Sequence, residues 1–242
     1  MQYKYTGLCM SDRINELFSS ISGKYDFMNH FLSMGIDKRW RAATAMEAIK
    51  EKRSYQILDV ATGTGDLAIA LAKEARRKGA TAKITGMDFN TEMIRLAKGK
   101  ISRFGLKSEV LIEKGDAMKM KYKPCSFDVV VSGFALRNFD SLQVFSKELM
   151  RVLRPGGRFV LLDMAMPDSG ISRSFFKFDF KVIKLVGSVV QKGAYSWLVS
   201  SVSDFDKKGF AKMLEKEGFK DVSISNLTTG LAFFVSGMKP VS

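Results

Sequence analysis

The residues best suited to bind a ligand lie at three points where a predicted strand ends. The first is the run Leu58-Asp59-Val60-Ala61-Thr62-Gly63-Thr64-Gly65-Asp66, and the others are Asp88, 23 positions after Gly65, and Gly115-Asp116-Ala117. Glycines let a ligand approach the backbone, and the amides of such a turn can hold a carboxylate. The carboxylate of Asp88 can accept hydrogen bonds from both ribose hydroxyls, and an acid beside a small residue can border an adenine ring. Together the three points indicate a nucleoside-binding site.

The glycine-rich run differs from two common phosphate-binding motifs. Reading from Gly63, Gly65 fits the dinucleotide fingerprint, but Ala68 stands where the third glycine should be. The run also lacks the lysine of a P-loop. Neither motif therefore accounts for this turn.

Alternating strands and helices must position these residues. The expected strands are Tyr55–Val60, Ala82–Met87, Glu109–Glu113, Phe127–Ser132, Arg158–Asp163, Val222–Leu227 and Leu231–Gly237. Helical spacing predicts helices over 67–78, 142–153 and 207–217, and Thr91 is the expected N-cap of a helix that ends at Phe104. Because Thr228-Thr229-Gly230 joins the last two strands tightly, those strands must be antiparallel. The pattern predicts an α/β fold, a seven-stranded and mostly parallel sheet with an antiparallel last strand and helices on both faces.

The composition fits one domain of an intracellular protein. No linker divides the 242 residues, so we expect a single domain over 1–242, with an N-terminal helical cap at about 10–50 and a helical insertion on the substrate side at about 165–205. Cys9 and Cys125 are expected to be reduced thiols, and no metal site is expected. The N-terminus is polar and no stretch approaches the roughly 20 apolar residues of a membrane span, so a cytoplasmic location is expected.

The formal net charge of +14 would attract an anionic partner, either a membrane surface or nucleic acid, and it fits equally a highly soluble protein with no such partner. Within the stretch 172–190, Arg173, Lys177, Lys181 and Lys184 follow at steps of four, four and three, which places them on one helical face. Such a basic amphipathic helix suits an anionic interface, where a lipid-like substrate would be collected. Core packing with a solvated basic edge is an equally good interpretation.

The three strand ends together resemble the class I S-adenosylmethionine-dependent methyltransferases. The flanking blocks resemble the C-methyltransferases of ubiquinone and menaquinone biosynthesis. These blocks are Lys24-Tyr25-Asp26-Phe27-Met28-Asn29, Leu32-Ser33-Met34-Gly35, Trp40-Arg41, Gly133-Phe134-Ala135-Leu136-Arg137-Asn138, Arg151-Val152-Leu153-Arg154-Pro155-Gly156-Gly157, Tyr195-Ser196-Trp197-Leu198 and Asn226-Leu227-Thr228-Thr229-Gly230. The resemblance runs from about Phe18 to Gly237 and implies a Rossmann-like fold and C-methylation of a prenylated benzoquinol or naphthoquinol ring.

The resemblance also implies which residues bind the cofactor S-adenosylmethionine. The expected cofactor-binding residues are Asp59, Gly63, Thr64, Gly65, Asp88, Asp116, Ala117 and Ser132. Two departures from the family's pattern fall where the substrate should lie. Asp163 replaces the usual glutamate, and the segment after Gly230 lacks the usual polar residue.

Catalysis requires a ring hydroxyl of the quinol to lose its proton, which makes the neighbouring carbon nucleophilic. We expect Arg137 to stabilise the forming phenolate, because an arginine stays protonated and is a poor base. Tyr25, Asp26 and Asp163 are the candidate proton acceptors. Arg137 could instead form a salt bridge that fixes its loop, and Tyr25 and Asp26 could merely anchor an N-terminal helix.

Three other functions stay open at this point. A methyltransferase acting on another hydrophobic small molecule would share every cofactor residue. An RNA methyltransferase would suit the net charge, but no appended RNA-binding module is found and no nucleic acid partner is expected. A non-catalytic binding protein would not need an intact glycine turn and both acids. A homodimer is also left open.

Overall fold

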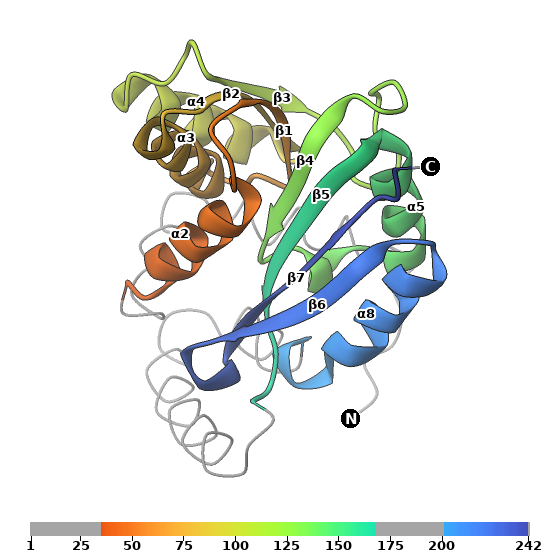
Figure 1. Cartoon of the computed structure of the whole chain (residues 1–242). Coiled ribbons are helices and arrows are strands. Elements are labelled where there is room, and N and C mark those ends of the chain that lie inside the picture. Colours follow the sequence, from red (N-terminus) through yellow and green to blue (C-terminus); the bar gives the residue numbers. More distant parts are fainter. Residues whose placement is uncertain (1–34, 168–200, 242) are drawn as a thin grey trace, which may run out of the picture.

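The computed structural model describes residues 35–167 and 201–241 (Figure 1). Seven strands form one sheet in the order β3-β2-β1-β4-β5-β7-β6. They are β1 (Ser54–Val60), β2 (Thr81–Asp88), β3 (Val110–Lys114), β4 (Phe127–Gly133), β5 (Leu153–Met164), β6 (Lys220–Leu227) and β7 (Ala232–Met238). Strands β1 to β5 are parallel, and β7 runs antiparallel to both β5 and β6. The predicted fold class is confirmed.

Helices cover both faces of this sheet, as Figure 1 shows. The described helices are α2 (Asp37–Ala48), α3 (Asp66–Lys78), α4 (Thr91–Arg103), α5 (Leu142–Val152) and α8 (Lys207–Lys216), with the 3-10 turns η1 (Leu136–Asn138) and η2 (Thr228–Gly230). Helices α2, α3 and α4 bury their apolar residues in one core, and α5 and α8 bury theirs in a second core on the opposite face. The sheet lies between these two cores.

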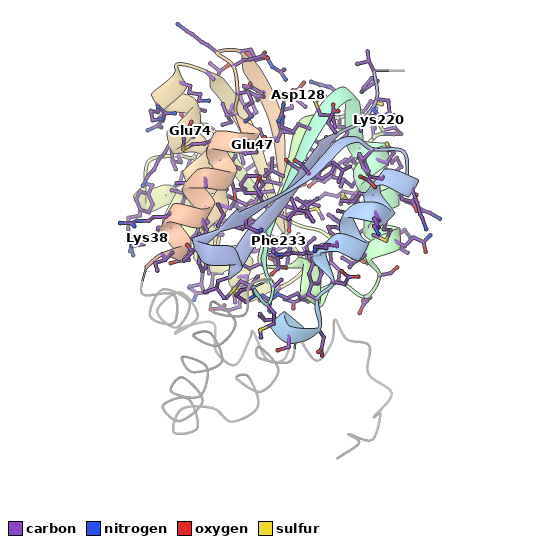
Figure 2. The ribbon with its side chains drawn as sticks, turned by 60° about the horizontal axis from the view of Figure 1, so that its bottom comes forward. Lys38, Glu47, Glu74, Asp128, Lys220 and Phe233 are labelled. Carbon is purple, nitrogen blue, oxygen red and sulfur yellow. The ribbon has the colours of Figure 1, made fainter. Side chains whose placement is uncertain are left out.

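The strand sequences fit a sheet that is buried on both faces. In β4, Val129 and Val131 pack into the core on the α3 side, and Val130 packs into the core on the α5 side. Side chains alternate across a strand, so a run of consecutive β-branched residues fills both cores. In Figure 2, Phe233 of β7 lies in the middle of the molecule, whereas Lys38 of α2 lies at its edge. The centre of the sheet therefore offers a firm base for loops at its ends.

Most local predictions differ from the structure only at element ends, by one or two residues, but β5 begins at Leu153, five residues before the predicted Arg158. One capping prediction is wrong. Asn90, not Thr91, caps α4, because its side-chain oxygen accepts hydrogen bonds from the amides of Glu92 at 2.9 Å and Met93 at 3.0 Å.

Two predicted regions lie largely outside the described residues. Of the expected cap at about 10–50, the structure describes residues 35–50, which contain α2. Of the expected insertion at about 165–205, it describes 165–167 and 201–205. The single-domain organisation therefore stays a prediction. Among the described helices, none combines the length and apolar character needed to cross a membrane.

Candidate active site

A cavity of about 260 Å³ lies at the carboxyl ends of β1, β2, β3 and β4. In an open parallel sheet, ligands bind beyond the carboxyl ends of the strands where the strand order reverses, which here is between β1 and β4. The volume is near the lower limit of about 300 Å³ for small-molecule sites. The predicted residues in its wall are Asp59, Gly63, Thr64, Asp88, Asp116 and Ala117.

The turn between β1 and α3 forms the floor of this cavity. Gly63 and Gly65 have φ angles of +56° and +85°, a left-handed conformation that glycine adopts without steric cost. Ala61, which is not a glycine, is held at φ +54° in the same turn. The Lys100 ammonium donates hydrogen bonds to the Thr64 hydroxyl at 2.9 Å and to Asp66 at 2.7 Å. Gly65 does not line the cavity, so its contribution is to the conformation of the turn.

Asp88 ends β2 and is fixed toward the glycine turn. Its two carboxylate oxygens accept hydrogen bonds from the Gly63 amide at 2.8 Å and the Asn90 amide at 2.9 Å. Burial raises the pKa of Asp88, and these amide hydrogen bonds oppose the rise. Each oxygen keeps a second lone pair, so the carboxylate can still accept hydrogen bonds from a ligand.

Asp59 is fully buried at the end of β1 and also lines the cavity. The Thr62 hydroxyl donates to its Oδ2 at 2.6 Å, whereas Oδ1 is buried without a hydrogen-bond partner of normal geometry among the described residues. Burial, with a smaller contribution from the neighbouring Asp88, raises the pKa of Asp59 to about 7. A buried acceptor atom without a donor is uncommon, and a ligand is one explanation for it.

Asp116 and Ala117 follow β3 on the side of the cavity next to Asp88. The Asp116 carboxylate accepts a hydrogen bond from the Met118 amide at 2.8 Å, which closes a tight turn. Met87 and Met118 add apolar surface to the same wall. A flat apolar ring would fit beside these side chains, with the Asp116 turn at its edge.

The opposite wall begins where β4 ends. Phe134 is held at φ +62°, a conformation rare for a bulky residue, and strained backbone of this kind concentrates at functional sites. The next turn, η1, brings Asn138 into the wall, and its side-chain oxygen is buried without a hydrogen-bond partner among the described residues. Asn138 belongs to a sequence block that resembles the family, but no sequence pattern predicts a role for its side chain. Arg41 of α2, also without a predicted role, completes the wall.

Arg137 and Asp163 meet as a buried ion pair behind this wall. Arg137 Nε lies 2.6 Å from Asp163 Oδ1, and the two side chains are 4% and 0% exposed. Arg137 Nη1 also donates to the Ser201 hydroxyl at 2.9 Å, and the Met164 amide donates to Asp163 at 2.7 Å. Neither Arg137 nor Asp163 is among the described residues that line the cavity. The alternative in which a salt bridge fixes the loop thus has direct geometric support, and the catalytic assignments stay predictions.

The other predicted residues lie away from the described cavity. Ser132 is buried within β4, and its hydroxyl donates to the Val60 carbonyl at 2.8 Å, so it links two strands of the sheet. Tyr25 and Asp26 lie outside the described residues. No group of His, Cys, Asp or Glu suited to a metal ion is found in the described part of the chain.

The charges of the cavity fit a cationic ligand. Five carboxyl groups and one cationic side chain, that of Arg41, line it among the described residues. The acidic residues are Asp59, Asp66, Asp88, Asp116 and Asp140. S-adenosylmethionine, a sulfonium nucleoside with an amino-acid end, matches this wall through its positive charge, ribose hydroxyls and adenine ring. The buried acceptors on Asp59 and Asn138 add to that fit.

Fold and site together define the class I S-adenosylmethionine-dependent methyltransferases. Solved structures support the fold. A methyltransferase from Aquifex aeolicus superposes with a TM-score of 0.59 at 21% identity, covering 82% of this chain and 89% of that one. A structure from Methanococcus maripaludis described as a putative S-adenosyl-L-methionine-dependent methyltransferase gives 0.63 at 16% identity, covering 99% and 97%.

The chain belongs to the ubiE/COQ5 methyltransferase family, whose model matches residues 8–239. It is 39% identical to the demethylmenaquinone methyltransferase of Deinococcus radiodurans over 223 residues, 90% of this chain and 89% of that protein. It is 35% identical to the ubiquinone/menaquinone biosynthesis C-methyltransferase UbiE of Geotalea daltonii over 231 residues, 94% and 97% of the two chains. The predicted family is therefore confirmed.

Proposed function

We propose that this chain transfers a methyl group from S-adenosylmethionine to a ring carbon of a prenylated quinol, as a step of menaquinone or ubiquinone biosynthesis. The observation that carries the proposal is the family match along residues 8–239. Relatives named demethylmenaquinone methyltransferase and ubiquinone/menaquinone biosynthesis C-methyltransferase support a quinol acceptor. The acidic cavity supports a cationic methyl donor.

In this proposal, the residues at the ends of β1, β2 and β3 hold the donor. Asp88, already oriented by two amides, accepts hydrogen bonds from the ribose hydroxyls. Asp116 and Ala117 border the adenine, and Gly63 and Thr64 let the donor approach the turn between β1 and α3. Asp59 places a buried carboxyl group near the donor's positive charge. Gly65 and Ser132 act indirectly, through the conformation of the turn and the sheet.

The donor supplies an activated methyl group on a positively charged sulfur. The protein's own task is to exclude water, orient the quinol and favour loss of the proton from its ring hydroxyl. We assign stabilisation of the resulting phenolate to Arg137, with Tyr25, Asp26 and Asp163 as candidate proton acceptors. The ion pair with Asp163 would hold the Arg137 guanidinium ready beside the wall formed by η1.

We also propose that the protein works in the cytoplasm at the inner face of the membrane, where a long-tailed quinol resides. The proposal rests on the net charge of +14 and on the helical spacing of basic residues in 172–190. That stretch lies outside the described residues.

The test of the proposed function is incubation with a donor carrying a labelled methyl group and a panel of demethylated quinols, followed by mass spectrometry of the lipid extract. The panel includes benzoquinols and naphthoquinols with short and long prenyl tails, and phenolic lipids and RNA serve as competing acceptors. We expect label on a quinol ring carbon. Label only on a phenolic lipid or RNA would contradict the proposal. Light scattering of the same preparation shows whether the protein is a homodimer.

A further inference from the structure

Arg41 occupies a defined position in the cavity wall. It lies on α2, and its guanidinium carbon sits 5.0 Å from the centre of the Phe134 ring. Its Nη1 donates to the carboxylate of Asp37, one helical turn earlier. The side chain is 12% exposed and lines the same cavity as Asp59 and Phe134. Ring stacking and the ion pair therefore fix the direction of a guanidinium that is close to the donor site.

The guanidinium also has hydrogen-bonding capacity to spare. Arginine carries five N–H donors in a rigid planar arrangement that matches the two oxygens of a carboxylate. Among the described residues, the Arg41 side chain donates one hydrogen bond, from Nη1 to the Asp37 carboxylate. Within the described part of the chain, the Nε and Nη2 donors therefore have no acceptor, and they can serve a ligand in the cavity.

The charge pattern of the wall indicates what that ligand group is. The carboxyl groups of Asp59 and Asp88 line the cavity, and they suit a sulfonium or an ammonium group. The same groups would repel a carboxylate unless a cation stood beside it. Among the described residues of the wall, Arg41 is the one cation, and it is close enough to Asp59 to lower the pKa of that acid, against the larger effect of burial.

We propose that Arg41 binds the carboxylate at the amino-acid end of the methyl donor. The inference rests on the proposed function, because it assumes S-adenosylmethionine in this cavity. It extends that function by assigning recognition of the carboxylate to α2, whereas the predicted cofactor residues all lie on the loops and strands from β1 to β4. Helix α2 thereby becomes part of the donor site.

The experiment compares two ligands that differ in one group, S-adenosylmethionine and its decarboxylated form, by calorimetric titration. Arg41→Gln should weaken binding of S-adenosylmethionine roughly 10- to 100-fold, the range expected for a charge-assisted hydrogen-bonded pair. Binding of the decarboxylated ligand should stay the same or become tighter, because a nearby cation repels a ligand that carries positive charge alone. Arg39→Gln removes a positive charge from an exposed position of the same helix and should change neither affinity.

Equal losses for both ligands would show that Arg41 only maintains the fold, and an unchanged affinity for S-adenosylmethionine would also overturn the proposal. If Arg41→Gln does not fold, Arg41→Lys gives the same comparison with the charge kept and the planar geometry lost. Its preference for the carboxylated ligand should fall below that of the wild type, and an unchanged preference would count against Arg41. A wild-type protein that binds neither ligand would contradict the proposed function itself.

Discussion

Asp59 and Asp88 place two buried carboxyl groups beside one cavity, and the pKa of each is raised by burial. Without a ligand, a negative charge on both would be costly, because the interior screens charges poorly. A cationic methyl donor relieves that cost. At the scale of single residues, the site is therefore arranged for a positive ligand, and two substitutions test this arrangement.

Asp88→Ala should weaken binding of S-adenosylmethionine by at least roughly 100-fold, because two charge-assisted hydrogen bonds to the ribose are lost. Calorimetric titration measures the change. Asp88 also fixes the amides of Gly63 and Asn90, so Asp88→Asn serves as the control that keeps one acceptor oxygen. The affinity of this control should fall between those of the Asp88→Ala variant and the wild type. An Asp88→Ala protein with unchanged affinity would remove Asp88 from the ribose site.

Asp59→Asn should stabilise the protein at neutral pH. The carboxyl of Asp59 keeps its proton up to about pH 7 in the folded state, but releases it near pH 4 in the unfolded state. The folded state therefore binds more protons between these values, and the free energy of unfolding falls as the pH rises through them. Asparagine carries no such charge, and its oxygen can still accept the hydrogen bond from Thr62.

The free energy of unfolding of Asp59→Asn, relative to that of the wild type, should rise by about 2 to 3 kcal/mol between pH 5 and pH 8. This figure follows from about 1.36 kcal/mol for each unit of difference between the folded and unfolded pKa within that pH range. Urea unfolding of the ligand-free protein at a series of pH values measures it. Parallel stability profiles for the two proteins would mean that Asp59 titrates like an exposed carboxyl group.

At the scale of elements, the Arg137–Asp163 ion pair ties η1 to β5. The turn η1 brings Asn138 into the cavity wall, so the ion pair also positions that wall. Removing one partner leaves a buried charge without compensation, which typically costs about 3–5 kcal/mol. A single substitution therefore cannot separate a catalytic role from a structural one.

The double variant Arg137→Gln/Asp163→Asn separates them, because it removes both charges together. It should unfold at a temperature closer to the wild type than Arg137→Gln alone, and bind S-adenosylmethionine with near wild-type affinity. If Arg137 stabilises the phenolate or Asp163 accepts the proton, turnover of the quinol should stay roughly 100-fold below the wild type. Recovery of turnover together with stability would show that the pair serves only to hold the wall.

The sequence was a good guide to the elements and to one side of the site. Consecutive valines in β4 and the glycines at positions 63 and 65 follow local rules, so the strands and the first turn were predictable. In a parallel sheet, the carboxyl ends of neighbouring strands lie at the same edge, which explains why Asp59, Asp88 and Asp116 lie in one cavity wall.

The second side of the site depends on contacts between distant segments, which no local pattern encodes. Arg41 reaches the cavity because α2 packs against the sheet, where Trp40 donates to the Thr228 hydroxyl at 2.8 Å across 188 positions of the chain. Arg137 and Asp163 are 26 positions apart and meet only in the folded sheet. Side-chain direction on a short turn such as η1 was equally beyond a sequence argument, so Asn138 received no role.

At the scale of the whole molecule, a basic protein surrounds an acidic cavity. The net charge is +14, whereas the described wall of the cavity carries five carboxyl groups and one guanidinium. A polyanion such as RNA would be attracted to the surface, but its phosphates would be repelled from this wall. The contrast agrees with a cationic donor inside the cavity and with the proposed anionic membrane surface outside.

Reversing Lys177, Lys181 and Lys184 to glutamate should reduce sedimentation of the protein with anionic vesicles, because each basic residue near such a surface contributes about 1 kcal/mol. Uncharged vesicles of the same size are the control, and sedimentation with them should be low for both proteins. Equal sedimentation of variant and wild type with anionic vesicles would remove the proposed membrane contact of this stretch.

The position of β7 has a consequence for synthesis of the chain. Strand β7 follows β6 in sequence but lies between β5 and β6 in the sheet. While the ribosome is still making β7, β6 has no partner and β5 has a bare flank, and both offer unpaired backbone groups to other chains. The sheet can therefore be completed only after β7 has been synthesised, because β7 pairs with both β5 and β6. A nascent chain stalled before Ala232 would be prone to aggregate. It would already contain all the described loops that line the donor cavity, since these precede β5 in the sequence.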